Sequence, residues 1–298
     1  MRPPCADQAM ELQAALQAFL LQLEADGRSP HTRNQYRRHG KALATWLEAR
    51  GVTSVAGLAP ELLARFFADD AAKTSCRGGP KRAVSLNAMR TSIRCFAAHL
   101  HGAGVVATNP ARLLRRARCA APPPRCLRAD EESRLLDVLA KAKGAQAERD
   151  RVLVLLLLKT GVRIGSALAL DVGDVDFANA ELMLRSTKND RPTTAVLPKD
   201  VSKKLRTFVA GRIDGPVFLA NGHRVSMRHA QRRLAGWFAK ANVAGKSAHS
   251  LRHSFATRIY GETGDLQLTQ AALGHASVNS TVIYAKLDRA RLRAVVGA

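Results

Sequence analysis

The sequence lacks any apolar run long enough to cross a membrane. Its longest uninterrupted apolar stretch extends from Val152 to Leu158, whereas a membrane-spanning helix needs about 20 apolar residues. The N-terminus shows no apolar leader, because Met1-Arg-Pro-Pro is followed directly by an amphipathic pattern. These absences argue against a membrane or secreted protein. We therefore expect a cytoplasmic protein that has no membrane partner.

The cysteines form no recognisable framework. They are odd in number, no two are spaced as Cys-x-x-Cys, and they stand at Cys5, Cys76, Cys95, Cys119 and Cys126. Such spacing predicts neither a disulfide scaffold nor a zinc site. We expect reduced thiols and no bound metal.

Acidic residues are scarce compared with basic ones. Lys and Arg number 47 and Asp and Glu number 24, which gives a net charge of +23. Residues 1–124 hold 18 basic and 8 acidic side chains, and residues 125–298 hold 29 and 16. A basic tail would indicate loose tethering, whereas two basic folded halves indicate a clamp around a polyanion. Nucleic acid is the favoured partner, and a solubilising surface is the alternative.

Helical periodicity runs through the N-terminal half. Apolar spacing predicts a helix over residues 11–25, a second from Pro30 with Ser29 as its N-cap, a third after Pro60, and a fourth from about Lys81 to His101. These helices carry basic faces, and the candidate contacts to nucleic acid are Arg33, Arg37, Arg38, Lys41, Lys81, Arg82 and Arg90. We expect an all-helical bundle of about 100 residues.

Three consecutive prolines, at positions 122–124, separate this bundle from a mixed second half. They cannot continue a helix and favour an extended spacer. Beyond them we expect a helix after Leu127, a buried helix over 151–159 that closes at Gly161, and a hairpin formed by 180–185 and 193–197. Further helices are expected near 201, 226, 249 and 266. The hairpin connection, 186–192, contains Lys188 and Arg191.

Cations and a phenol gather in the C-terminal region. The segment His249-Ser-Leu-Arg252-His253 is followed by Leu273-Gly-His275 and then by Tyr284. Because His249 and Arg252 are three residues apart, they share one face of a helix, whereas His253 lies on a neighbouring face and is interpreted as structural. In isolation each of these residues is equally compatible with an ordinary surface position.

A phosphodiester resists attack because its free oxygens repel nucleophiles, and two arginines neutralise that charge well. Arg252 is one candidate and Arg163, after Thr160-Gly-Val, is the second, although Arg163 alone would read as a surface arginine beyond a helix cap. Tyr284 has an ordinary pKa of about 10 and becomes a nucleophile only beside a base or cations. Lys188 would protonate the leaving oxygen. Tyr36 and Tyr260 lie in amphipathic helices and are interpreted as packing residues.

In their order and spacing these motifs resemble those of the tyrosine recombinase (phage integrase) family. They are Thr160-Gly-Val-Arg163-Ile-Gly-Ser-Ala-Leu-Ala-Leu, the hairpin Lys188, His249-Ser-Leu-Arg252-His, Leu273-Gly-His275 and Thr281-Val-Ile-Tyr284, with Ser29-Pro-His-Thr32 and Tyr36 near the start. The resemblance implies two domains: an all-α, SAM-like core-binding bundle (8–118) and, after a linker (119–126), a mixed α/β but mainly helical catalytic domain with a small β-sheet (127–298). A helix over 288–296 would dock into a neighbouring subunit.

The resemblance also implies roles. Arg163 and Arg252 would bind the scissile phosphate, His249 and His275 would assist proton transfer, and Lys188 would act as general acid. Tyr284 would form a 3′-phosphotyrosine, without metal or other cofactor. The implied partners are double-stranded DNA and further subunits, in a tetramer on two DNA sites or paired with a related recombinase. The setting would then be the nucleoid, and the outcome integration, excision or resolution.

Two positions depart from the family pattern. Ser166 stands where the family usually has an acid, and Arg191 competes with Lys188 for the general-acid role. The core-binding helix begins within about ten residues of Met1, which favours a simple Xer-like or transposon-type recombinase over an arm-binding one. Two alternatives remain: a type IB topoisomerase-like enzyme that relaxes DNA, and a DNA-binding regulator whose site has decayed.

Overall fold

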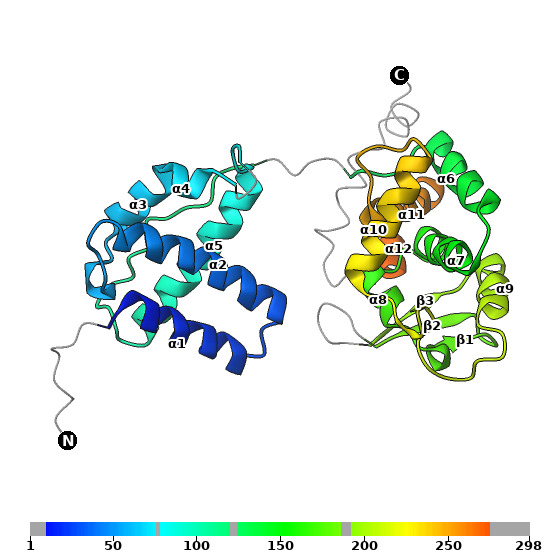
Figure 1. The fold of residues 1–298 in the computed structure, drawn as a ribbon, viewed down its shortest axis with the longest axis horizontal. Helices are drawn as coiled ribbons and strands as arrows, with labels where there is room; N and C mark the ends of the chain where they lie inside the picture. Colours follow the sequence, from blue (N-terminus) through cyan, green and yellow to red (C-terminus); the bar gives the residue numbers. More distant parts are fainter. Residues whose placement is uncertain (1–9, 76–77, 120–123, 186–191, 275–298) are drawn as a thin grey trace. The chain divides into compact units, whose positions relative to one another are not determined.

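The computed structural model describes residues 10–75, 78–119, 124–185 and 192–274. The chain divides into two compact units, Met1–Ala121 and Pro122–Ala298. Each has its own apolar core, and the helices of the first are blue to cyan in Figure 1, while those of the second are green to orange. None of the helices in these described ranges is both long enough and apolar enough to cross a membrane.

The first unit is helical, as predicted. Its α-helices are α1 (Leu12–Ala25), α2 (Pro30–Glu48), α3 (Pro60–Ala68), α4 (Asp70–Lys73) and α5 (Ala83–Gly102), with a 3-10 turn at Val55–Gly57. The start of α2 is confirmed: the Ser29 hydroxyl accepts the Thr32 N–H, and Pro30 occupies the first turn. The short α4 was not predicted, and α5 begins two residues later than Lys81.

The core of the first unit lies where α1, α2 and α5 pack together. Phe19 of α1 stacks on Tyr36 with ring centroids 5.9 Å apart, and it also contacts Phe96 of α5. The Tyr36 hydroxyl donates to the Cys95 sulfur over 3.7 Å. Tyr36 is therefore a packing residue, as its helix pattern predicts.

The second unit is mixed, again as predicted. Its α-helices are α6 (Ala129–Lys141), α7 (Ala145–Thr160), α8 (Ile164–Ala169), α9 (Lys199–Phe208), α10 (Met227–Lys240), α11 (Ala248–Thr263) and α12 (Leu266–Leu273), and its strands are β1 (Val175–Asp176), β2 (Glu181–Leu184), β3 (Thr193–Val196), β4 (Leu219–Ala220) and β5 (His223–Arg224). The predicted buried helix is the C-terminal part of α7, which starts six residues before the predicted start at residue 151. Neither α8 nor the two-residue strands were predicted.

Helix α7 runs through the middle of this unit and contacts α6, α9 and α11 (Figure 1). Its apolar run is buried on almost every side, because neighbours cover it all round. Near its start, the carboxylate of Asp150 accepts hydrogen bonds from Arg149, from Arg233 (2.7 Å) and from the Trp237 ring nitrogen (2.8 Å). This buried ion cluster joins α7 to α10.

A small antiparallel sheet, β1-β2-β3, flanks the helices. Its hairpin pairs Leu182 with Ala195 and Leu184 with Thr193. Because strand side chains alternate between faces, Leu182 and Leu184 point into the core while Glu181 and Met183 are exposed. The hairpin connection with Lys188 and Arg191 lies outside the described residues.

Candidate active site

Arg252 is buried in the first half of α11. Its Nη1 donates to the carbonyl oxygen of Gly161 (2.5 Å) and its Nη2 to that of Leu273 (2.7 Å). Only 7% of the residue is exposed. Arg252 therefore braces the C-terminal end of α7 against the end of α12, which the helical spacing alone did not predict.

Arg163 is positioned by a tight turn after α7. Gly161 ends α7 with φ +65°, a left-handed conformation that glycine adopts without strain. A Cβ at Gly161 would lie 2.2 Å from Cδ1 of Phe255 on α11, so the turn also needs glycine for close packing. Arg163 then serves as the N-cap residue of α8 and is half-buried.

A small cavity brings together the two arginines, the hairpin and the end of α12. Its lining includes Arg163, Ser166, Arg252, the β3 residues Thr193 and Thr194, and Gly274. The loop that carries Lys188 joins the two strands of this hairpin, and His275 follows Gly274 directly. The connectivity thus leads the chain from the cavity wall to both predicted residues, although Lys188, His275 and Tyr284 lie outside the described residues.

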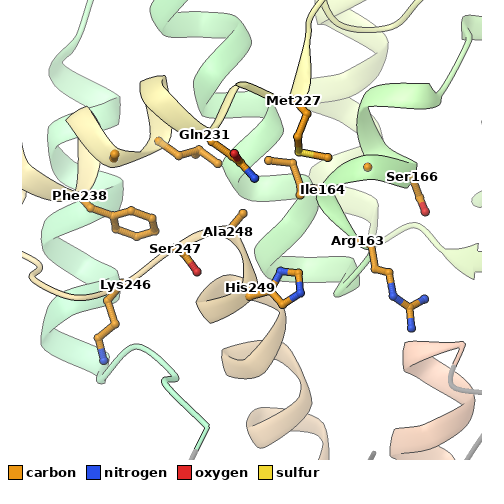
Figure 2. Close-up of a pocket in the computed structure, with 13 residues that line it drawn as sticks. Arg163, Ile164, Ser166, Met227, Gln231, Phe238, Lys246, Ser247, Ala248 and His249 are labelled. Carbon is orange, nitrogen blue, oxygen red and sulfur yellow. The ribbon is translucent and has the colours of Figure 1, made fainter. Parts of the chain in front are cut away.

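A larger cleft of about 820 Å³ opens beside this cavity, between α8, α10 and the start of α11. Figure 2 shows Arg163 and His249 next to one another at one end of it. Desolvation by the surrounding protein, followed by the charges of Arg252 and Arg163, lowers the pKa of His249. Its imidazole is therefore neutral near pH 7 and able to accept a proton.

Ser166 is buried and lines both the cavity and the cleft. Among the described lining residues, neither space contains an aspartate or a glutamate. Two guanidinium groups and an imidazole therefore face a region with no described carboxylate, which suits a phosphate. His253, interpreted as structural, is half-buried, with its ring centroid 6.4 Å from that of His249.

The comparisons with known proteins agree with this geometry. A model of the phage integrase family matches residues 125–291. Tyrosine recombinase XerC of Chromobacterium violaceum is 32% identical over 281 residues, which cover 92% of this chain and 90% of the relative. XerC of Serratia marcescens is 32% identical over 288 residues, with 94% and 92% covered. The chain belongs to the phage integrase family. It is a site-specific tyrosine recombinase of the Xer-like type.

Solved structures share the fold of this recombinase. A XerH site-specific recombinase bound to its palindromic difH substrate matches with a TM-score of 0.71 at 18% identity, covering 99% of each chain. A lambda integrase dimer bound to a core site matches with a TM-score of 0.72 at 17% identity, covering 94% of this chain and 78% of the other. The two-domain recombinase fold predicted from the motifs is confirmed.

The predicted DNA contacts of the recombinase differ in their exposure. Exposed side chains are those of Arg37, Arg38, Lys41 and Arg82. Arg33 pairs with Glu24, Lys81 donates to the Ala72 carbonyl over 2.8 Å, and Arg90 lies over the Phe67 ring at 4.8 Å. The last three are therefore partly occupied by contacts within the first unit.

The first unit also has a cationic pocket that was not predicted. It measures about 400 Å³ and is lined by Arg94, Arg112 and Arg116 together with Thr91 and Asn109. The run Arg112-Leu-Leu-Arg-Arg116 is visible in the sequence. Its connection to Arg94 depends on how the segment after α5 folds back, which no local pattern reveals.

Proposed function

We propose that this recombinase cleaves and rejoins DNA strands through a 3′-phosphotyrosine at Tyr284. The observation that carries the proposal is the position of Arg163, which lines the small cavity together with Arg252, the hairpin of Lys188 and the residue before His275, and lines the adjoining cleft together with His249. Such a cationic pocket stabilises the charge that grows on the phosphate oxygens during attack.

In the proposed reaction the Tyr284 oxygen attacks the phosphorus atom and the bond to the 5′ oxygen breaks. Arg163 and Arg252 hold the phosphate oxygens, and Lys188 gives the leaving 5′ oxygen its proton. His249, neutral because its pKa is lowered, and His275 position the phosphate and take up the proton that the Tyr284 hydroxyl loses as its oxygen attacks. Rejoining is the reverse attack by a 5′ hydroxyl. The phosphotyrosine conserves the energy of the broken bond, so the cycle requires neither metal nor ATP.

We further propose that double-stranded DNA is bound by both a core-binding domain (8–118) and a catalytic domain (127–298), which are joined by a linker (119–126). Arg37, Arg38, Lys41 and Arg82 would contact the backbone, and Arg33, Lys81 and Arg90 would join them only after giving up part of their present contacts. A related fold is seen in a lambda integrase tetramer bound to a Holliday junction. This likeness supports a tetramer on two DNA sites, or a pair of related recombinases. Such an assembly would act in the cytoplasm at the nucleoid.

The test uses two matched tyrosine variants. Tyr284→Phe should keep DNA binding but form no covalent adduct with DNA, because the ring remains while the nucleophilic oxygen is lost. Tyr260→Phe is the control, since Tyr260 packs on α11 beside Phe255 and Leu273. Adducts are trapped on a pool of DNA fragments, separated in denaturing gels and sequenced. An adduct that survives in Tyr284→Phe would show that another residue is the nucleophile.

The two alternatives give different products. Exchange of strands between two labelled duplexes is expected of a recombinase, whereas supercoil relaxation without exchange would indicate a topoisomerase-like enzyme. Binding without any adduct in the unmodified protein would indicate a regulator.

A further inference from the structure

The segment that enters the second unit is fastened to the start of α11. Leu127 donates its backbone N–H to the Ser254 hydroxyl over 2.7 Å, and that hydroxyl bonds in turn to the Ser250 carbonyl over 3.0 Å. Arg125 donates to the Gly245 carbonyl over 3.3 Å. The chain that follows the proline-rich stretch therefore lies against the helix that carries His249 and Arg252.

The central contact is made by Lys246. Its ammonium donates to the Cys126 carbonyl oxygen over 2.6 Å and lies 3.2 Å from Oε2 of Glu131. Its side chain is only 16% exposed and that of Glu131 only 10%, so both charges are largely shielded from water. The same Glu131 oxygen accepts the Arg128 N–H over 2.8 Å at the start of α6. The Lys246 ammonium thus connects the segment just before α11 to the entering chain and to the first turn of α6.

Lys246 is also part of the wall of the large cleft. The wall continues through Ser247 and Ala248 to His249, and Figure 2 shows Lys246 at the opposite end from Arg163. The Ser247 N–H donates to the Ser250 hydroxyl over 3.1 Å, which closes the first turn of α11. A displacement of Lys246 would therefore be transmitted to His249 along the backbone of Ser247 and Ala248.

We infer that Lys246 is a positioning residue for the strand-cleavage reaction. It fastens the entering chain to the segment 246–249 and so sets the orientation of the His249 imidazole relative to Arg163. The inference rests on the proposed function for its kinetic consequence. Lys246 itself faces Cys126 and Glu131 rather than the phosphate-binding cavity, and it is absent from that cavity's lining. Its effect is therefore on the rate of cleavage and not on the affinity for DNA.

The geometry distinguishes this residue from other lysines of the unit. Lys203 on α9 is exposed, whereas the Lys246 ammonium has a half-buried carbonyl and a buried carboxylate as acceptors. Methionine at 246 would keep most of the apolar stem but remove the ammonium from both acceptors, and Glu131 would keep only the Arg128 guanidinium as a cation partner, 3.6 Å from its Oε1. Arginine at 246 would keep a donor within reach of each. Comparing the methionine and arginine variants therefore separates the effect of the polar contacts from the effect of the apolar stem.

The test measures single-turnover adduct formation and DNA affinity separately, in the full chain. Lys246→Met should lower the cleavage rate about tenfold, because small misplacements of reacting groups are costly, while Kd for the same DNA changes less than about threefold. Lys246→Arg should restore most of the rate. Lys203→Met, which removes one exposed charge of the same sign, should leave the rate unchanged. Glu131→Gln, which keeps an acceptor for the Arg128 N–H, should lower the rate by a smaller factor.

A second readout keeps the inference separable from the proposed function. Amide hydrogen exchange should accelerate in residues 247–252 of Lys246→Met, without a change in α5, even in DNA-free protein. An unchanged exchange rate there, or a weaker Kd with an unchanged rate at saturating DNA, would overturn the inference. Absence of any adduct in the unmodified protein, with the exchange effect intact, would instead overturn the proposed phosphotyrosine chemistry and leave the positioning contact standing.

Discussion

Replacing Gly161 with alanine should destabilise the second unit more than the same change at its other described glycines with positive φ. Two costs combine. Alanine in the left-handed conformation at φ +65° costs about 1–2 kcal/mol. The new Cβ would also lie 2.2 Å from the Phe255 ring, and overpacking of this kind costs about 1–3 kcal/mol. The free energy of unfolding should therefore fall by about 2–5 kcal/mol.

Gly211 supplies a matched control. Its φ is +81°, but a Cβ there would meet no atom within 4 Å. Gly211→Ala should therefore show only the backbone cost, about 1–2 kcal/mol. The difference between the two variants isolates the contact with Phe255.

Urea unfolding followed by Trp237 fluorescence reports on the second unit, in a background where Trp46 of the first unit is replaced with phenylalanine. The slope of free energy against urea should stay the same while the midpoint falls. In Gly161→Ala with Phe255→Ala the two losses should be less than additive, by about 1–3 kcal/mol, because the clash disappears. If Gly161→Ala matches Gly211→Ala to within about 0.5 kcal/mol, the packing explanation of this turn is wrong.

Two further predictions concern buried charges. Burial, followed by the charges of Arg38 and Lys81, lowers the pKa of His39 to about 4. The unfolded state takes up a proton at His39 near pH 6.5 and the folded state does not. The contribution of neutral His39 to the stability of the first unit should therefore be fully present above pH 6.5. It should be lost as the pH falls toward 4, by at most about 1.4 kcal/mol per pH unit, and His39→Gln should flatten that dependence in thermal unfolding at a series of pH values. Asp150→Ala leaves Arg149 and Arg233 without their carboxylate and should cost about 3–5 kcal/mol in urea unfolding; a loss below about 1 kcal/mol would mean that water replaces the carboxylate.

Features that depend on local chemistry were predictable from the sequence. Ser29 and Pro30 predict the start of α2 because helix capping involves only neighbouring residues. Gly161 marks the end of α7 for the same reason. The hairpin was predictable because alternation of apolar side chains is a property of each strand alone.

Features that depend on distant contacts were not. The sequence Ile164–Ala169 is too short for its apolar spacing to predict a helix, and α8 forms with Ile164 and Leu168 buried against the rest of the unit. The helical spacing of Arg252 suggested only that it shares a face with His249. Its burial follows from two carbonyl groups that lie 91 and 21 residues away in sequence, and the roles of Lys188, His275 and Tyr284 stay predictions.

The existence of two separate apolar cores has a consequence for how this enzyme tolerates heat and mutation. Each core consists of residues of its own unit, so a substitution in one core acts directly on the melting of that module. An enzyme that needs both modules on the DNA stops working when the weaker one melts. The stability of the weaker module therefore sets the upper working temperature of the enzyme.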